Sequence, residues 1–283
     1  MKDRKWLCAV IVATFGLVIL SVASNAGLSV GPLSVRLDLS AGETDTAALS
    51  VQNTGDETID VVMSLHDWWR TPAGSLQILP PNSVERSCTP WLLFAPTALS
   101  LGPGESRMIT LELAVPEEVD GEKVEGDHWA LLLVEESPQT AQTEETKSVT
   151  GATEVAISYA IKILQQDPVT RHRAAEVTNI ELLQTDPLTV LIGYENVGNA
   201  HLQTTGVVEV LDVQGEAVRR FDIALFPTLP GERRVLRVEE AGGEEPLSVG
   251  SYLLRAIFDF GGEYLIQGGL PFELSPPSGT GES

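Results

Sequence analysis

Two apolar segments stand out in this chain, Asp127-His-Trp-Ala-Leu-Leu-Leu-Val-Glu-Glu136 and Glu154-Val-Ala-Ile-Ser-Tyr-Ala-Ile-Lys-Ile-Leu164. Both read as β-strands, because they are short, apolar and bounded by turn residues. Between them lie seventeen residues, 137–153, that are rich in Thr, Gln and Glu, whereas a hairpin loop normally takes about two to five. We therefore expect a hairpin whose connection is mobile or functional, and we look for a binding role at the outer edge of the second strand.

Four landmarks occur in the same order in both halves of the chain. They are an Asn-x-Gly turn after a strand, a Gly-centred turn, a Pro-Gly-Glu turn before an alternating strand, and a Gly-led strand with an early aromatic residue. In the first half they are Asn53-Thr-Gly55, Thr71-Pro-Ala-Gly74, Pro103-Gly-Glu105 and Gly126-Asp-His-Trp129; in the second they are Asn196-Val-Gly198, Asp212-Val-Gln-Gly215, Pro230-Gly-Glu232 and Gly250-Ser-Tyr252. The shared order predicts an all-β chain with two immunoglobulin-like β-sandwich domains.

The predicted domains cover residues 27–164 and 174–274, with a linker at 165–173 and a disordered tail at 275–283. In the first domain we expect an initial strand at Leu33–Leu39 and a hairpin at Asn53 whose return strand is Ile59–Trp68. We expect Trp91-Leu-Leu-Phe94 to close one end of the core. In the second domain, strands Tyr252–Phe258 and Glu263–Ile266 should join across Gly261-Gly262.

Residues 1–26 look like an export segment. Basic residues precede an uncharged run, Trp6 to Val22, and the small-residue pattern Ser24-Asn25-Ala26 follows it. The run suits a signal peptide cleaved after Ala26 or an uncleaved N-terminal membrane anchor, and both remain open. Either way, we expect the rest of the chain to be extracytoplasmic, in the periplasm or at the cell surface, with no membrane contact except through an uncleaved N-terminal segment.

The formal net charge of −22 disfavours binding to nucleic acid and to anionic lipid. It serves solubility or the recruitment of basic partners. Because Cys8 belongs to the export segment, Cys88 is the only thiol of the exported part, which excludes an internal disulfide. We expect Cys88 to be an ordinary, partly buried thiol.

The chain shows no constellation for catalysis. His66-Asp67-Trp68 and Asp127-His128-Trp129 could share one sandwich edge, but without a third ligand they read as polar strand ends beside core tryptophans. There is no Gly-x-Ser-x-Gly elbow and no Ser-x-x-Lys motif. We therefore predict a protein that is not an enzyme, with no cofactor and no metal site.

The two apolar segments with the long polar connection resemble the F and G strands in the first domain of PapD-type periplasmic pilus-assembly chaperones. Arg36 in the first strand, the Asn53 turn, Trp91–Pro96 and the Pro103-Gly-Glu105 turn follow in the order that this family shows. The resemblance covers about Leu28 to Pro168, and the second domain shows only generic sandwich landmarks. It implies that the second strand adds to an unfinished, pilin-like extracytoplasmic subunit by β-augmentation.

Carried over residue by residue, the resemblance implies that Val155, Ile157 and Tyr159 fill the client's groove. It implies that Lys162, with Arg36, holds the client's C-terminal carboxylate. Alternation places Val155, Ile157, Tyr159, Ile161 and Ile163 on one face and Lys162 on the other. The chain departs from the family at Thr153, where a further apolar residue is expected, and in the position of Arg36 relative to Gly42.

Two functions follow as alternatives. The first is an exported chaperone-like protein that binds partner subunits by strand addition through the edge strand 154–164. The second is a non-catalytic structural or adhesion module of the cell envelope, in which that strand packs into its own core and Lys162 discourages aggregation at the edge.

Overall fold

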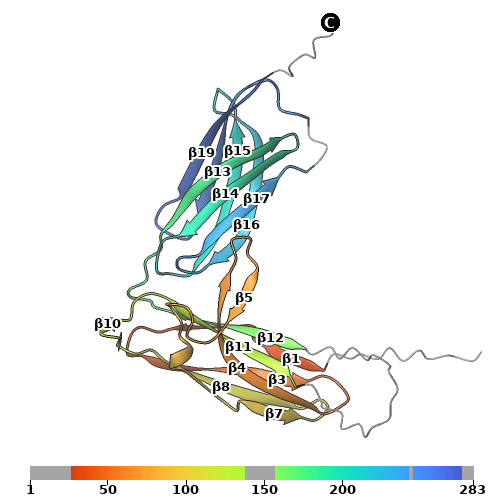
Figure 1. The fold of residues 1–283 in the computed structure, drawn as a ribbon, viewed down its shortest axis with the longest axis vertical. Helices are drawn as coiled ribbons and strands as arrows, with labels where there is room; N and C mark the ends of the chain where they lie inside the picture. The colour runs from red at the N-terminus through yellow and green to blue at the C-terminus, as the bar shows by residue number, and fades with distance from the viewer. Residues whose placement is uncertain (1–26, 138–156, 242–244, 276–283) are drawn as a thin grey trace, which may run out of the picture.

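The computed structural model describes residues 27–137, 157–241 and 245–275, and these residues form two immunoglobulin-like β-sandwiches (Figure 1). The fold class predicted from the sequence is therefore confirmed. The first sandwich contains β1 (Leu28–Gly31), β2 (Ser34–Asp38), β3 (Thr44–Asn53), β4 (Ile59–Arg70), β5 (Leu76–Leu79), β6 (Leu92–Ala95), β7 (Ala98–Leu101), β8 (Ser106–Ala114), β9 (Glu118–Val119), β10 (Glu122–Lys123), β11 (His128–Glu136) and β12 (Ser158–Gln166), with a short 3-10 helix η1 (Thr89–Trp91). The second contains β13 (Ala175–Thr185), β14 (Leu188–Asn196), β15 (Leu202–Leu211), β16 (Ala217–Thr228), β17 (Arg233–Glu239), β18 (Gly250–Asp259) and β19 (Ile266–Leu274).

Each sandwich packs two sheets around its own apolar core. In the first, the sheet β1-β3-β8-β6 faces the sheet β2-β12-β11-β4-β5, and in the second, β13-β14-β17 faces β16-β15-β18-β19. Leu49, Ile109 and Leu132 are fully buried in the first core, and Tyr194 and Phe258 in the second. A third cluster joins the two sandwiches and contains Trp68, Trp129, Leu131, Leu164 and Leu229.

The predicted export segment, residues 1–26, lies outside the described residues, as do residues 138–156 of the polar connection and residues 276–283 of the tail. Within the described part of the chain, no helix has the length and hydropathy that a membrane-spanning segment requires.

The internal repeat is present at the level of single hydrogen bonds. The side-chain amide of Asn53 donates to the carbonyls of Glu57 and Leu101, and Asn53 Oδ1 accepts from Gly55 N. In the second sandwich, the amide of Asn196 donates to the carbonyls of Ala200 and Thr228, and its oxygen accepts from Gly198 N. Both asparagines are fully buried, so each Asn-x-Gly landmark forms the same corner.

The prediction of a hairpin at Asn53 is wrong. β3 and β4 belong to opposite sheets, so the corner carries the chain across the sandwich. Leu49 and Val51 of β3 and Ile59 and Val61 of β4 all point into the same core, which requires the two strands to face each other across it. The half-buried alternation predicted for Ile59, Val61, Met63 and Leu65 is nevertheless present.

The closing hairpin of the second sandwich is formed by β18 and β19, but the predicted second strand, Glu263–Ile266, is misplaced. β19 begins at Ile266 and continues to Leu274, paired along its length with β18. The strand is hard to recognise in the sequence because it contains Gly268, Gly269 and Pro271, residues that are uncommon in strands. Pro271 is tolerated because β19 is the edge of its sheet.

Candidate functional site at the edge of β12

β12 has a strand on one side along its whole length and on the other side along only half of it. It pairs antiparallel with β11 from Ser158 to Gln165, whereas its parallel partner β2 covers only Lys162 to Gln166. Among the described residues, no strand pairs with the outer edge of β12 between Ser158 and Ile161. The edge strand predicted from the sequence is thus half open, and its open half leads directly to Lys162.

The backbone of this open half points unpaired groups outward. Ile157 O accepts from Glu136 N of β11, at 3.0 Å, whereas Lys162 N donates to Leu33 O on the opposite side, at 3.2 Å. Because successive residues of a strand direct their N–H and C=O groups to alternate sides, Ser158 and Ala160 present theirs at the open edge. An added strand would therefore meet two donors and two acceptors.

The side chains of β12 alternate between two faces as the sequence predicts. Ile161 and Ile163 are buried in the first core, and Ile157 and Tyr159 pack partly against it. Tyr159 Oη donates a 2.8 Å hydrogen bond to Leu28 O of β1. Of the three residues expected to fill the client's groove, Ile157 and Tyr159 thus face the first core beside the unpaired part of β12. The third, Val155, lies outside the described residues.

Lys162 lies on the opposite face, toward the second sandwich. Its Nζ is 5.2 Å from the centroid of the Trp68 ring, within the range of a cation–π contact. Burial lowers the pKa of Lys162, the nearby charge of Arg70 lowers it further, and Glu232 partly offsets both effects. The ammonium group therefore sits in a partly desolvated position, where an added anion would be bound more strongly than in water.

Arg36 lies on the same face of the sheet as Lys162. In the parallel pairing of β2 with β12, Lys162 is opposite Ser34 and Arg36 is opposite Leu164, so the two cations are two positions apart along the strands. Neither cation has a carboxylate oxygen within 4.0 Å among the described residues. The structure thus places near each other the two residues to which the family resemblance assigns one anchor.

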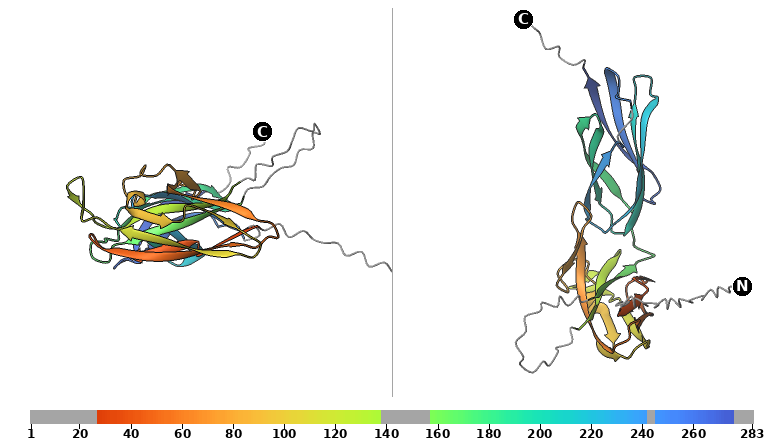
Figure 2. Two further views of the ribbon diagram at one scale, coloured as in Figure 1. Left: turned by 90° about the horizontal axis from the view of Figure 1, so that it is seen from below. Right: turned by 90° about the vertical axis from the view of Figure 1, so that its right-hand side faces the viewer.

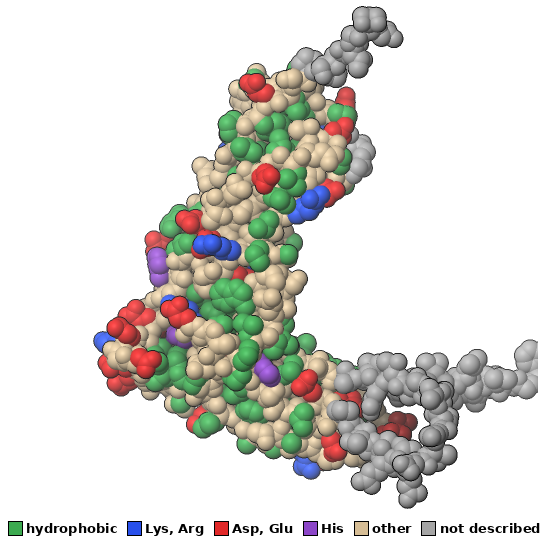
Figure 3. All heavy atoms as spheres, in the orientation of Figure 1, with side chains coloured by type: hydrophobic (Ala, Val, Ile, Leu, Met, Phe, Trp, Pro, Cys, Tyr) green, Lys and Arg blue, Asp and Glu red, His purple; other side chains and the backbone are tan. Residues whose placement is uncertain are grey.

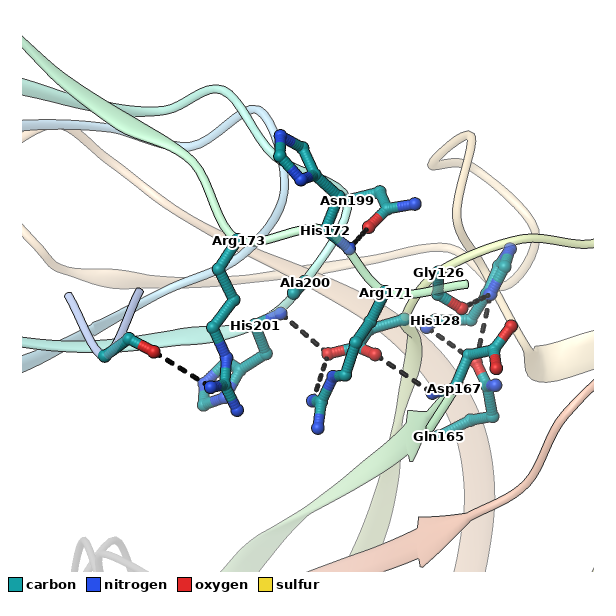
Figure 4. A network of polar contacts seen from close by, with 12 residues as sticks. Gly126, His128, Gln165, Asp167, Arg171, His172, Arg173, Asn199, Ala200 and His201 are labelled. Carbon is teal, nitrogen blue, oxygen red and sulfur yellow. Dashed lines mark hydrogen bonds and ion pairs between the residues drawn. The ribbon is translucent and has the colours of Figure 1, made fainter. Parts of the chain in front are cut away.

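The junction of the sandwiches is held by Asp127, whose side chain is almost completely buried (Figure 4). Its Oδ2 accepts from His201 N at 2.7 Å and from the guanidinium of Arg171 at 2.9 Å, and its Oδ1 accepts from Asp167 N at 3.0 Å. Asp127 N in turn donates to Asn199 O. One carboxylate therefore ties β11, the linker and the start of β15 together, a role that sequence analysis did not identify.

A second connection is the arm formed by the end of β4, its turn and β5, which rises from the first sandwich beside the second (Figure 2). Arg70 of the arm contacts Glu232 at 3.2 Å, with both side chains almost fully buried, and Val235 N donates to Pro72 O at 2.8 Å. Burial raises the pKa of the Glu232 carboxyl, while Arg70 and the backbone N–H of Leu229 lower it. Hydrophobic side chains gather on the surface around this arm (Figure 3), where Leu76 and Ile78 are exposed.

Three other residues that the sequence analysis singled out, Trp68, Trp129 and Cys88, are buried. Trp68 and Trp129 are buried and bond each other's strands, since Trp68 Nε1 donates to Ala130 O and Trp129 Nε1 to Trp68 O. Cys88, predicted to be partly buried, is completely buried, and burial raises the pKa of its thiol. No group of three or more metal-ligating side chains occurs in the described part of the chain.

The fold is similar to that of PapD-like fimbrial chaperones over most of the chain. One similar structure is a class 5 fimbriae chaperone, CfaA, with a TM-score of 0.47, 15% identity, and coverage of 88% of this chain and 99% of that one. Another is the CsuC–CsuE chaperone–tip adhesion subunit complex of archaic Csu pili from Acinetobacter baumannii, with a TM-score of 0.47, 12% identity, and coverage of 86% and 98%. The E. coli chaperone DraB has a TM-score of 0.42, 15% identity, and coverage of 88% and 96%.

No protein-family model and no curated protein sequence matches the chain. At 12–15% identity, the likeness to solved structures describes the arrangement of strands and not the residues of the site.

Proposed function

We propose that this protein is an extracytoplasmic chaperone-like protein that holds partner subunits by adding one of their strands to the open edge of β12. The observation that carries the proposal is the half-covered edge of β12, which ends at an unpaired lysine. Ser158 and Ala160 would supply the main-chain hydrogen bonds, which give affinity in strand addition. Val155, Ile157 and Tyr159 would supply the apolar contacts.

The end of the open edge suits a chain terminus. A strand added beside Ser158 to Ile161 meets Ser34 of β2 at Lys162 and has no room to continue along the edge. A C-terminal carboxylate arriving there would lie beside Lys162 and Arg36, neither of which has a carboxylate partner in the part of the chain that the structure describes. Charge-assisted hydrogen bonds from these cations would fix the register of the client.

A second candidate function is a structural or adhesion module of two sandwiches without chaperone activity. It is favoured by the packing of Ile157 and Tyr159 against the first core and by the hydrogen bond from Tyr159 to Leu28. In that case the open edge is short, and Lys162 serves only to discourage edge-to-edge association.

The two functions are separated by co-purification of the full-length chain from its native host. Lys162→Ala should weaken client binding by about 10- to 100-fold, because a charge-assisted hydrogen bond contributes roughly 1.5–3 kcal/mol. Lys123→Ala, which removes an equally unpaired lysine on β10, is the matched control and should retain the client. Ile157→Asp should also release the client while the first sandwich stays folded, as circular dichroism would show.

A photocrosslinking residue at Ser158 identifies the contact. The chaperone function requires that the crosslinked peptide is the C-terminal strand of the captured protein. Capture of no client by the unmutated chain, or full retention by both variants, would leave the structural module as the function.

A further inference from the structure

Several cationic side chains without a carboxylate partner among the described residues lie at the junction of the two sandwiches. The described lysines and arginines without a carboxylate oxygen within 4.0 Å are Arg36, Arg86, Lys123, Lys162 and Arg173. Arg36, Lys162 and Arg173 lie at the junction of the sandwiches. A chain with a formal net charge of −22 has ample carboxylates to pair these cations, yet they are unpaired here.

Two of these cations border a cavity of about 250 Å³ that lies beyond Lys162. Arg36 of β2 forms one side, and Arg171 and Arg173 of the linker form another, with the buried ring of Phe260 beside them. The remaining lining residues are Gln166, His201, Gln203 and Gly261. Among the described residues, the walls therefore combine cations with neutral donors and contain no carboxylate.

Both arginines of the linker are held in place, Arg171 by a carboxylate and Arg173 by a neutral carbonyl. Arg173 donates to Gly261 O, a neutral carbonyl, at 2.8 Å (Figure 4). Arg171 bonds Asp127, but its buried Nε has no partner in the described part of the chain. The guanidinium of Arg173, which bonds Gly261 O through one nitrogen, has donors left to bind an anion in a fork geometry.

His201 provides a neutral donor or acceptor in the cavity wall. It is 8% exposed, and its backbone N–H is bonded to Asp127, whereas its ring makes no hydrogen bond to another described residue. Burial lowers its pKa to about 4, and the charges of Arg36, Arg70, Arg171 and Lys162 contribute to the shift. At neutral pH the ring is uncharged, and the positive field around it favours an anion beside it.

We propose that this cavity is a second carboxylate subsite, in which the linker arginines bind the side chain of an acidic residue at the client's C-terminus while Lys162, with Arg36, binds the terminal carboxylate. The inference rests on the proposed function. Arg36 is two residues along β2 from Ser34, the neighbour of Lys162, which corresponds to about 7 Å. A C-terminal Glu or Asp offers two carboxylates, one for each of two neighbouring cationic positions. The subsite thus selects clients by their last residue.

Calorimetric titration of the exported chain with two tripeptides tests this subsite. N-acetyl-Ala-Ala-Glu carries two carboxylates and N-acetyl-Ala-Ala-Ala carries one, and the first should bind about tenfold more tightly. Arg173→Gln should abolish this preference without changing the affinity for the alanine peptide. Arg86→Gln is the matched control, because Arg86 also lacks a carboxylate partner and donates to a carbonyl, Glu125 O, at 2.9 Å; it should keep the preference.

Three results would overturn the subsite: equal affinities for the two peptides, no binding of either peptide, or a preference that survives Arg173→Gln. Titration with glutarate shows whether the two carboxylates must belong to a peptide. If glutarate binds as tightly as the glutamate peptide, the cavity is a site for free dicarboxylates and not for a client's C-terminus. Lys162→Gln distinguishes this inference from the proposed function. If the alanine peptide depends on Lys162 but no preference for glutamate exists, only the subsite fails; if it binds independently of Lys162, the anchor itself fails.

Discussion

Both sandwiches contain a Pro-Gly-Glu turn, but the glutamate of this turn has a different role in each. In each, the glutamate of the Pro-Gly-Glu turn accepts a 2.9 Å hydrogen bond from a backbone N–H three residues earlier, Gly102 for Glu105 and Leu229 for Glu232. Glu105 pairs with exposed Arg107, whereas Glu232 is fully buried and pairs with Arg70 of the other sandwich. The same turn is thus a surface feature in one domain and the connection between domains in the other.

The edge strands of the two closing hairpins differ in the same way. β19 carries Pro271 and the glycines Gly268 and Gly269, which oppose the pairing of a further strand. The open half of β12, from Ser158 to Ile161, contains neither proline nor charge. This contrast between a protected edge and an available one supports the proposed function, in which a partner's strand pairs with the open half of β12.

The largest contrast concerns the two glutamates. Glu232→Ala should lower the free energy of unfolding by about 3–5 kcal/mol, because it leaves Arg70 buried without a partner. Glu105→Ala should cost less than about 1 kcal/mol, since its pair is solvent-exposed. Urea unfolding measures both. Equal losses would show that the buried pair does not hold the domains together.

The next contrast is a pH dependence at the junction. The pKa of His201 is lowered to about 4, so between pH 6.5 and pH 4 the unfolded chain binds a proton that the folded chain does not. The contribution of His201 to stability should therefore fall with decreasing pH through this window, by on the order of 3 kcal/mol, and level off below it. Lowering of the pKa of His128 by burial adds in the same direction.

His201→Gln should flatten this dependence in unfolding experiments at pH 4 to 7, and His172→Gln, at an exposed position, is the control. An unchanged pH profile in His201→Gln would contradict the description of His201 as a buried neutral ring.

The two asparagine corners should be equivalent. Asn53→Ala and Asn196→Ala each remove a buried side chain that donates to two carbonyls, so each should cost about 1–3 kcal/mol, with similar values. Thermal unfolding of both variants provides the measurement. A loss confined to one asparagine would break the equivalence of the repeats.

The smallest contrast compares two glycines with positive φ. Gly126 (φ 74°) lies against Asn199, where an added Cβ would be 2.6 Å from the backbone oxygen, whereas Gly121 (φ 85°) has open space. Both alanine variants are destabilised by the strained φ, and Gly126→Ala should lose about 1–2 kcal/mol more. If calorimetry shows equal losses, Gly126 and Asn199 do not pack as closely as this contact requires.

Local patterns predicted the elements well. The Asn-x-Gly and Pro-Gly-Glu turns identified the repeat, and the period of two in β12 correctly placed Ile161 and Lys162 on opposite faces. The hairpin at Asn53 was mispredicted because a turn motif does not show whether the next strand joins the same sheet or the facing one. Gly268 and Pro271 hid β19 for a similar reason, since edge strands tolerate residues that strand patterns exclude.

The junction could not be predicted from sequence patterns. Arg70 and Glu232 are 162 residues apart, and Asp127 and His201 are 74 apart, so no periodicity relates them. Arg173 and His201 lack a recognisable motif and become a candidate subsite only when the linker folds beside β2. Of the proposed site, the sequence pattern therefore predicted the strand, the family resemblance pointed to Lys162 and Arg36, and the structure showed their surroundings.

Amide hydrogen exchange of β12 tests strand addition most directly. In the free protein, the N–H groups of Tyr159 and Ile161 point toward β11 and should be protected, whereas those of Ser158 and Ala160 should exchange quickly. With the captured client bound, Ser158 and Ala160 should become protected as well. Fast exchange of Ser158 and Ala160 in the complex, or their protection in the free protein, would contradict the account.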